Sequence, residues 1–184
     1  MDDATAFRRA SDNYVRLARE VSPSQWAATT PCAEWDVRAL VNHVAGEYLW
    51  VPELLAGRTI ADVGSRLDGD LLGDDPLEAL VNAARDAQAA AREDDALTRV
   101  VHLSFGDVPG AEYLKQMAVD SVIHSWDLAR SIGSDETLDP ELVDFSYAEM
   151  CQHAEDWRSG GAFGPAKEPA DDSTQSLLLA LTGR

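Results

Sequence analysis

Basic residues are scarce in this chain. Its 184 residues include 15 lysines and arginines against 33 aspartates and glutamates, which gives a formal net charge of -18. Proteins that bind nucleic acids or anionic membranes need a basic surface. We therefore expect neither nucleic acid nor membrane among the partners of this protein.

Cysteine is almost absent, and long apolar runs are missing. Cys32 and Cys151 are the two cysteines, and neither belongs to a CxxC pair, which excludes a zinc ribbon or a thioredoxin-type motif. No stretch approaches the apolar length of a membrane span, and the N-terminus lacks the charged and then apolar layout of a secretion signal. These absences predict a cytoplasmic protein with two ordinary thiols.

The pattern of apolar residues is helical over most of the chain. Apolar residues recur at spacings of three and four, and Asp36, Asp75 and Gly133 stand where helix caps are expected. The predicted helices cover 3–20, 37–57, 75–94, 111–132, a segment that starts at 139, and a last short segment around 177–181. We predict a loop over 57–75, a short strand or an extended crossover over 97–105, and a turn over 106–110. One all-α domain over 1–184, a helical bundle with additional short C-terminal helices, is the expected architecture.

Two polar residues interrupt the apolar face of the predicted helix over 111–132. Asp120 and His124 share that face with Tyr113, Met117 and Leu128, because residues three and four apart are stacked neighbours on a helix. An ionised carboxylate buried there costs several kcal/mol, roughly, unless a group of opposite charge pairs with it. A bound cation is one such partner.

A third residue of the same kind, His43, interrupts the apolar pattern of the predicted helix over 37–57. If the two helices meet, His43, Asp120 and His124 supply two imidazoles and one carboxylate with open positions for water or substrate. This is the ligand set of a catalytic divalent metal. The spacing alone is equally compatible with a buried hydrogen-bonded pair or a partly solvated groove.

The sequence also resembles a known family. The residues that carry the resemblance are Trp26, the run Pro31-Cys32-x2-Trp35-Asp36-Val37-Arg38, the run His43-Val44-x-Gly46-Glu47, the run His124-Ser125-Trp126-Asp127-Leu128-Ala129-Arg130, and the closing Leu177-Leu178-x-Ala180-Leu181-x-Gly183-Arg184. Together they are similar to the DinB/YfiT-like metal-binding superfamily, and within it to the actinobacterial branch related to the N-terminal domain of mycothiol-dependent maleylpyruvate isomerase.

The resemblance implies a fold, a metal site and a chemistry. It implies a DinB-like four-helix bundle in which His43, Asp120 and His124 hold a divalent metal, zinc or nickel, with aspartate where the isomerase type has glutamate. It further implies a small-molecule thiol of the mycothiol type as co-substrate, and a small electrophile as substrate. Bound metal would lower the pKa of the thiol or activate water. The protein would be a monomer or a homodimer.

Three further residues could support the metal ligands or contact substrate. Glu47, one helical turn after His43, could be a general base, a fourth ligand or an exposed glutamate. Arg38 could lie near the mouth of the site or form a salt bridge with Asp127 or Glu34. Asp127 points about a quarter-turn away from His124, which suits a supporting role better than direct ligation.

The remaining histidines and tryptophans have simpler interpretations. Trp35 and Trp126 are expected to anchor the core. His102 and His153 are expected on the surface, and Arg130 has the same alternatives as Arg38.

Three functions are compatible with these residues. The first is a metal-dependent S-transferase or isomerase that uses a small thiol. The second is a metal-dependent hydrolase, in which the same site activates water. The third is a non-catalytic protein whose metal holds the bundle together.

Overall fold

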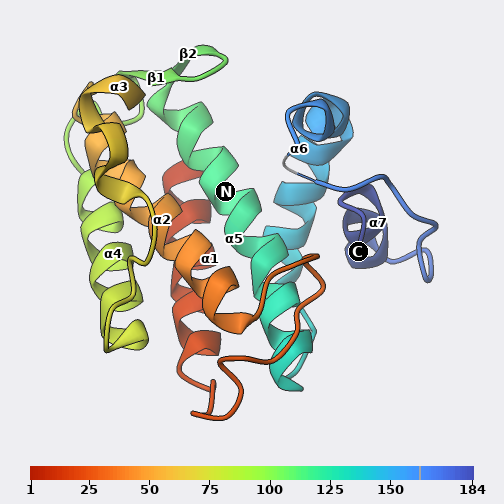
Figure 1. The fold of residues 1–184 in the computed structure, drawn as a ribbon. Coiled ribbons are helices and arrows are strands. Elements are labelled where there is room, and N and C mark those ends of the chain that lie inside the picture. Colours follow the sequence, from red (N-terminus) through yellow and green to blue (C-terminus); the bar gives the residue numbers. More distant parts are fainter. Residues whose placement is uncertain (162) are drawn as a thin grey trace.

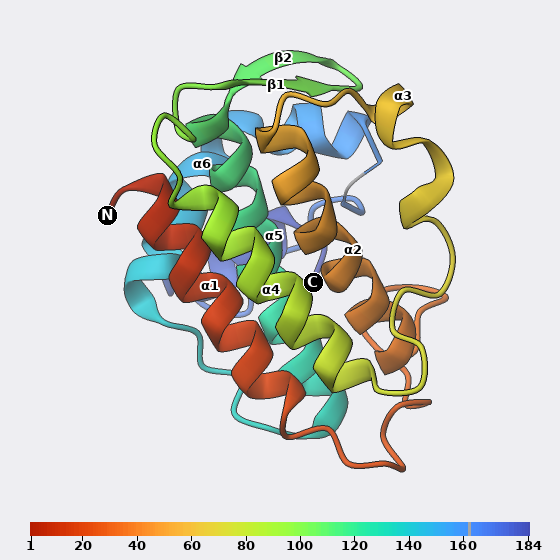
Figure 2. The same cartoon turned by 90° about the vertical axis from the view of Figure 1, so that its left-hand side faces the viewer.

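Four long helices form a bundle in the computed structural model, which describes residues 1–161 and 163–184. The helices are α1 (Asp3–Ala18), α2 (Val37–Leu55), α4 (Pro76–Ala91) and α5 (Gly110–Ile132). Figure 2 shows α1 and α4 side by side in front, with α2 and α5 behind them. The all-α four-helix bundle predicted from the sequence is confirmed.

The helix ends lie where the capping residues predict them. The Asp36 carboxylate accepts a hydrogen bond from the Ala39 amide at 2.8 Å and so begins α2. Asp75 caps α4, with Pro76 in the first turn. Gly133 ends α5 in the left-handed conformation, φ 71°, which a residue with a side chain rarely adopts.

The bundle is held together by α1 packed on α5 and by α2 packed on both α4 and α5. Phe7 of α1 meets Tyr48 of α2 edge to face, with ring centroids 5.8 Å apart. Each fully buried side chain of this size contributes about 1.5–3 kcal/mol. The Tyr48 hydroxyl also lies 3.0 Å from Ser121 Oγ, which ties α2 to α5 through a buried hydrogen bond.

Two further helices pack outside the bundle. Figure 1 shows α6 (Pro140–Ser159) and α7 (Thr174–Leu181) beyond α5, away from α2 and α4. As expected, α7 is short, with 8 residues, whereas α6 has 20 and is as long as the bundle helices. Within the described ranges, no helix is long and apolar enough to cross a bilayer.

The connections contain more structure than the sequence predicts. The segment predicted as a loop over 57–75 holds a short helix, α3 (Ile60–Val63), and a 3-10 turn, η1 (Gly64–Leu67). Thr59 and Asp62 form a capping box that starts α3. The predicted turn over 106–110 is wrong, because Gly106–Pro109 is a strand, β2, paired antiparallel with β1 (Val100–Leu103).

Candidate metal centre

The structure brings the three predicted metal ligands together between α2 and α5, which run in opposite directions (Figure 1). One oxygen of Asp120 lies 3.3 Å from His124 Nε2, and the other lies 3.6 Å from His43 Nε2. One donor atom from each residue lies within 4.8 Å of the other two. Both imidazoles therefore present the same nitrogen, Nε2, to one carboxylate.

These separations fit donor atoms arranged around one small cation. Zinc binds nitrogen and carboxylate oxygen at about 2.0–2.2 Å, so tetrahedral ligands lie roughly 3.3–3.6 Å apart. The shorter aspartate in place of glutamate is therefore no obstacle, because Asp120 reaches both imidazoles from its own helix. His43 and Asp120 keep 27% and 19% of their side-chain surface exposed, which leaves a side open to solvent.

The charges around Asp120 stabilise its ionised form. Burial alone would raise the pKa of the Asp120 carboxyl, but the two imidazoles, His124 foremost, hold it well below its usual range. Burial works against the charged form of His124, but Asp120 and Asp127 outweigh it and raise the pKa of that imidazole well above its ordinary value. A divalent cation held between the two imidazoles and Asp120 would also stabilise the ionised carboxylate.

Asp127 contacts the ring nitrogen of His124 that does not face Asp120. Its Oδ2 lies 2.8 Å from His124 Nδ1. Burial raises the pKa of Asp127, but hydrogen bonds from His124 and Arg184 outweigh it and keep that pKa below its usual range. The carboxylate therefore stays ionised and accepts a hydrogen bond from the Nδ1–H group of His124. With the proton on Nδ1, the Nε2 lone pair of a neutral His124 is free to bind a metal. Asp127 thus contacts a candidate ligand and is not itself one of the three donor residues.

Arg184 and Cys32 complete this cluster, and sequence reasoning missed both. Arg184 donates from Nη2 and Nε to the two oxygens of Asp127, at 2.6 and 3.1 Å, and its Nη2 lies 3.4 Å from Cys32 Sγ. Cys32 Sγ lies 3.3 Å from Asp127 Oδ2. Both residues belong to the runs that carry the family resemblance, and this membership was the signal in the sequence that could have marked them as site residues.

Cys32, His124 and Asp127 form a second group whose donor atoms are close enough to hold an ion. The guanidinium of Arg184 already provides a positive charge at this position. The 2.8 Å contact between His124 and Asp127 is a hydrogen bond, shorter than the spacing of two metal ligands. The group of His43, Asp120 and His124 is therefore the better candidate.

Trp35 covers one side of the imidazoles. Its ring centroid lies 4.9 Å from that of His43 and 6.1 Å from that of His124. Trp35 packs against the core as expected, but its side chain is only partly buried and also lies against the candidate ligands. Trp126 is buried as expected, with the Arg130 guanidinium 5.2 Å from its ring.

Glu47 lies beside His43 and is not an exposed helix residue. Its Oε1 is 4.0 Å from His43 Nδ1, and a third of the side chain, 32%, is exposed. Burial is the main cause that raises the pKa of Glu47 to about 7, and the nearby charge of Asp120 raises it further. Glu47 lies near Nδ1 of His43 and is not one of the three grouped donor residues, so its position suits a proton acceptor better than an additional ligand.

The structure places Arg38 away from the three donor atoms. Its guanidinium binds Asp70 at 3.0 Å and the Gly73 carbonyl at 2.8 Å, instead of the Asp127 or Glu34 considered from the sequence. Arg130 likewise pairs with Glu136. The arginine at the site is Arg184, which reaches it because α7 packs on α6.

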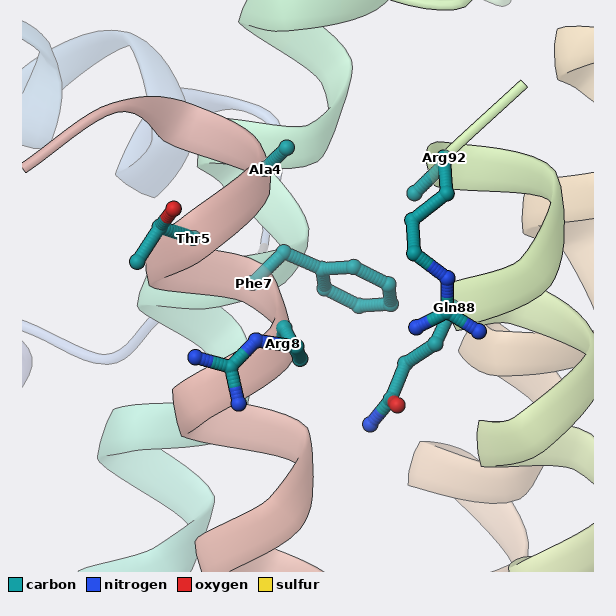
Figure 3. A pocket seen from close by; sticks show the side chains of 7 residues that line it. Ala4, Thr5, Phe7, Arg8, Gln88 and Arg92 are labelled. Carbon is teal, nitrogen blue, oxygen red and sulfur yellow. The ribbon is translucent and has the colours of Figure 1, made fainter.

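The hollow drawn in Figure 3 lies elsewhere on the surface. It encloses about 210 Å³ between α1 and α4, over the ring of Phe7, with Arg8 and Arg92 at its edges. Arg8 already pairs with Asp12 at 3.2 Å. No predicted site residue lines this hollow.

Known proteins resemble this chain in both sequence and fold. Residues 7–129 match the family model described as the mycothiol maleylpyruvate isomerase N-terminal domain. An uncharacterized protein of Mycobacterium tuberculosis, from strains CDC 1551 and H37Rv, is 33% identical over 147 residues, which cover 78% of this chain and 74% of the relative.

Two solved structures share the fold. They are crystal structures of mycothiol-dependent maleylpyruvate isomerase and of a histidine-to-alanine mutant of that enzyme, with TM-scores of 0.65 and 0.64 and sequence identities of 19% and 18%. Each likeness covers 89% of this chain and 73% of the solved one. The match over most of the helical bundle, together with the relatives at 33% identity, shows that this chain belongs to the mycothiol maleylpyruvate isomerase N-terminal domain family.

Proposed function

We propose that this protein is a divalent-metal enzyme that uses a small thiol, of the mycothiol type, to isomerise or S-conjugate a small electrophile. The observation that carries the proposal is the convergence of His43, Asp120 and His124 on one point between α2 and α5. The family match supports the choice of thiol, because the enzyme that gives the family its name depends on mycothiol.

Different residues of this chain would have different roles in the proposed reaction. His43, Asp120 and His124 would hold zinc or nickel, which lowers the pKa of a bound thiol when present. Asp127 would keep the proton of His124 on Nδ1 and so leave the Nε2 lone pair available to hold the ion. The indole of Trp35 keeps water from one side of the imidazoles.

A metal-dependent hydrolase is the second candidate, and Glu47 is the observation that favours it. A carboxyl group near the ligands with a pKa of about 7 suits the acceptance of a proton from water at neutral pH. The same group could accept the proton of a thiol. Turnover of esters or amides without thiol would favour the hydrolase.

Elemental analysis tests the metal site. Wild-type protein reconstituted with zinc or nickel should hold about one ion per chain, and Asp120→Ala and His124→Ala should each lose most of it. His102→Ala and Asp107→Asn are matched controls, because these residues form another histidine–carboxylate pair, at 2.8 Å, in the distant hairpin. Full metal occupancy in both site variants would refute the site.

Thiol consumption tests the chemistry. Metal-loaded protein should consume mycothiol, or isomerise substrate only in its presence, with a panel of small electrophiles. The Asp120→Ala variant should lose this activity, whereas Asp107→Asn should keep it. Metal binding without any activity would support the non-catalytic alternative.

A further inference from the structure

The two flanks of the candidate metal centre differ. On the flank toward the start of α2, Trp35 lies against both imidazoles, and the cluster of Cys32, Asp127 and Arg184 is closed by mutual hydrogen bonds. A ligand at an open metal position therefore has little room on this side. The other flank, toward the end of α2 and the start of α5, is where a bound molecule would extend.

Glu47 and Tyr113 lie on this second flank. Glu47 is one helical turn beyond His43 on α2, and Tyr113 is two turns before Asp120 on α5, in line with it. The helices α2 and α5 run in opposite directions (Figure 1). A position after His43 on α2 and a position before Asp120 on α5 are therefore on the same side of the three donor atoms.

The Tyr113 hydroxyl has an unmet hydrogen-bonding capacity. It is buried and has no partner among the described residues, although buried hydroxyls are nearly always hydrogen-bonded. Burial and the charges of Glu47 and Asp120 raise the pKa of Tyr113 well above its usual value, so the hydroxyl keeps its proton and is a donor. Glu47 likewise has no hydrogen bond to another described residue and offers an acceptor.

We propose that Tyr113 and Glu47 together recognise a neutral hydrogen-bonding group, a hydroxyl or an amide, at the far end of a molecule held by His43, Asp120 and His124. Such a group accepts a hydrogen bond from Tyr113 and donates one to Glu47. A carboxylate could use only the first of these contacts, and Glu47 and the net charge of -18 disfavour it. The inference rests on the proposed metal site and names the ligand class that the site prefers.

The separation of these residues sets the size of the ligand. Seven residues along a helix correspond to about 10.5 Å between Cα atoms. A ligand must therefore carry its hydroxyl or amide several bonds away from the metal-bound atom.

Three thiols with the same three-carbon chain test the inference on cobalt-substituted protein. The probes are 3-mercaptopropan-1-ol, 1-propanethiol and 3-mercaptopropionate, and binding is measured by the thiolate-to-cobalt absorption band. The wild type should bind the alcohol most tightly. Tyr113→Phe should weaken binding of the alcohol about threefold to tenfold, the value of one neutral hydrogen bond, and leave propanethiol within about twofold.

Tyr14→Phe is the matched control, because Tyr14 is also fully buried with an unpartnered hydroxyl but comes from α1. It should retain the preference for the alcohol. Equal affinity of the wild type for the three thiols, or a Tyr113→Phe variant that keeps the preference, would overturn the recognition role and leave the metal site intact. Failure of the wild type to bind cobalt would overturn the proposed function itself.

Discussion

Replacement of Asp127 by asparagine tests whether the hydrogen bonds of Asp127 to His124 and Arg184 stabilise the candidate metal centre. Asp127 is fully buried and accepts hydrogen bonds from His124 Nδ1 at 2.8 Å and from two nitrogens of Arg184 at 2.6 and 3.1 Å. Asparagine keeps the size of the side chain but removes its charge and one acceptor oxygen. The variant therefore leaves the Arg184 guanidinium, 9% exposed, without a counter-charge.

The expected loss of stability is large for a substitution that changes so little volume. Removal of one partner from a buried ion pair costs about 3–5 kcal/mol, because the other charge stays desolvated. The asparagine oxygen can still accept one hydrogen bond from Arg184, so we expect about 2–4 kcal/mol in the metal-free protein. The asparagine amide can also donate to His124 Nδ1 and move its proton to Nε2, which should lower metal affinity about 10- to 100-fold.

Urea unfolding in the presence of a chelator measures the first effect, and competition with a metal indicator measures the second. Asp107→Asn is the control, since Asp107 pairs with His102 on an exposed hairpin; it should change stability by no more than about 0.5 kcal/mol. The double variant Asp127→Asn/Arg184→Gln should recover part of the lost stability, because it no longer buries an unpaired charge.

Two results would refute this reasoning. One is an Asp127→Asn variant with wild-type stability and metal affinity. The other is a double variant whose loss equals the sum of the single losses, which would mean that Arg184 and Asp127 act independently.

Three other perturbations have defined outcomes. Asp120→Glu should keep metal affinity within about 10-fold, whereas Asp120→Ala should lose more than about 100-fold, as measured by indicator competition; equal losses would exclude ligation by the carboxylate. Removal of metal by a chelator should lower stability by about 2.7 kcal/mol relative to protein with free metal at 100 times its Kd, as measured by thermal unfolding; an unchanged melting temperature would contradict a metal site. Asp139→Ala should destabilise by about 1 kcal/mol at neutral pH, through loss of the α6 helix cap. Burial opposes ionisation of Asp139, but Arg9 and the capped amide lower its pKa, so this contribution is present above about pH 4 and fades as the pH falls through the lower folded value; pH-independent destabilisation would refute the assignment.

The helices were predictable because their signals are local. Asp36, Asp75 and Gly133 cap helices through atoms three or four residues away, so short stretches of sequence determine these ends. The strand over Gly106–Pro109 was missed because glycine and proline are typical of turns. Its pairing with Val100–Leu103 supplies the hydrogen bonds that outweigh this local preference.

The candidate site was predictable in part for the same reason. Asp120 and His124 share a helix face, and their 3.3 Å contact follows from helical spacing alone. His43 joined them through the family resemblance and an assumed meeting of helices. The role of Glu47 stayed open, and the contact of Trp35 with the imidazoles was not foreseen, because the sequence does not show which side chains face a partner helix.

The sequence by itself determined the helical class of this protein, its caps, and the two donor residues on one face of α5, since all of these depend on interactions within a few residues. Only the tertiary structure decided that His43 Nε2 comes within 3.6 Å of Asp120, and that Arg184, 57 residues after Asp127, binds Asp127 beside His124. These contacts depend on how α2 packs on α5 and α7 on α6, and that packing follows from burial of the whole apolar surface instead of any local pattern.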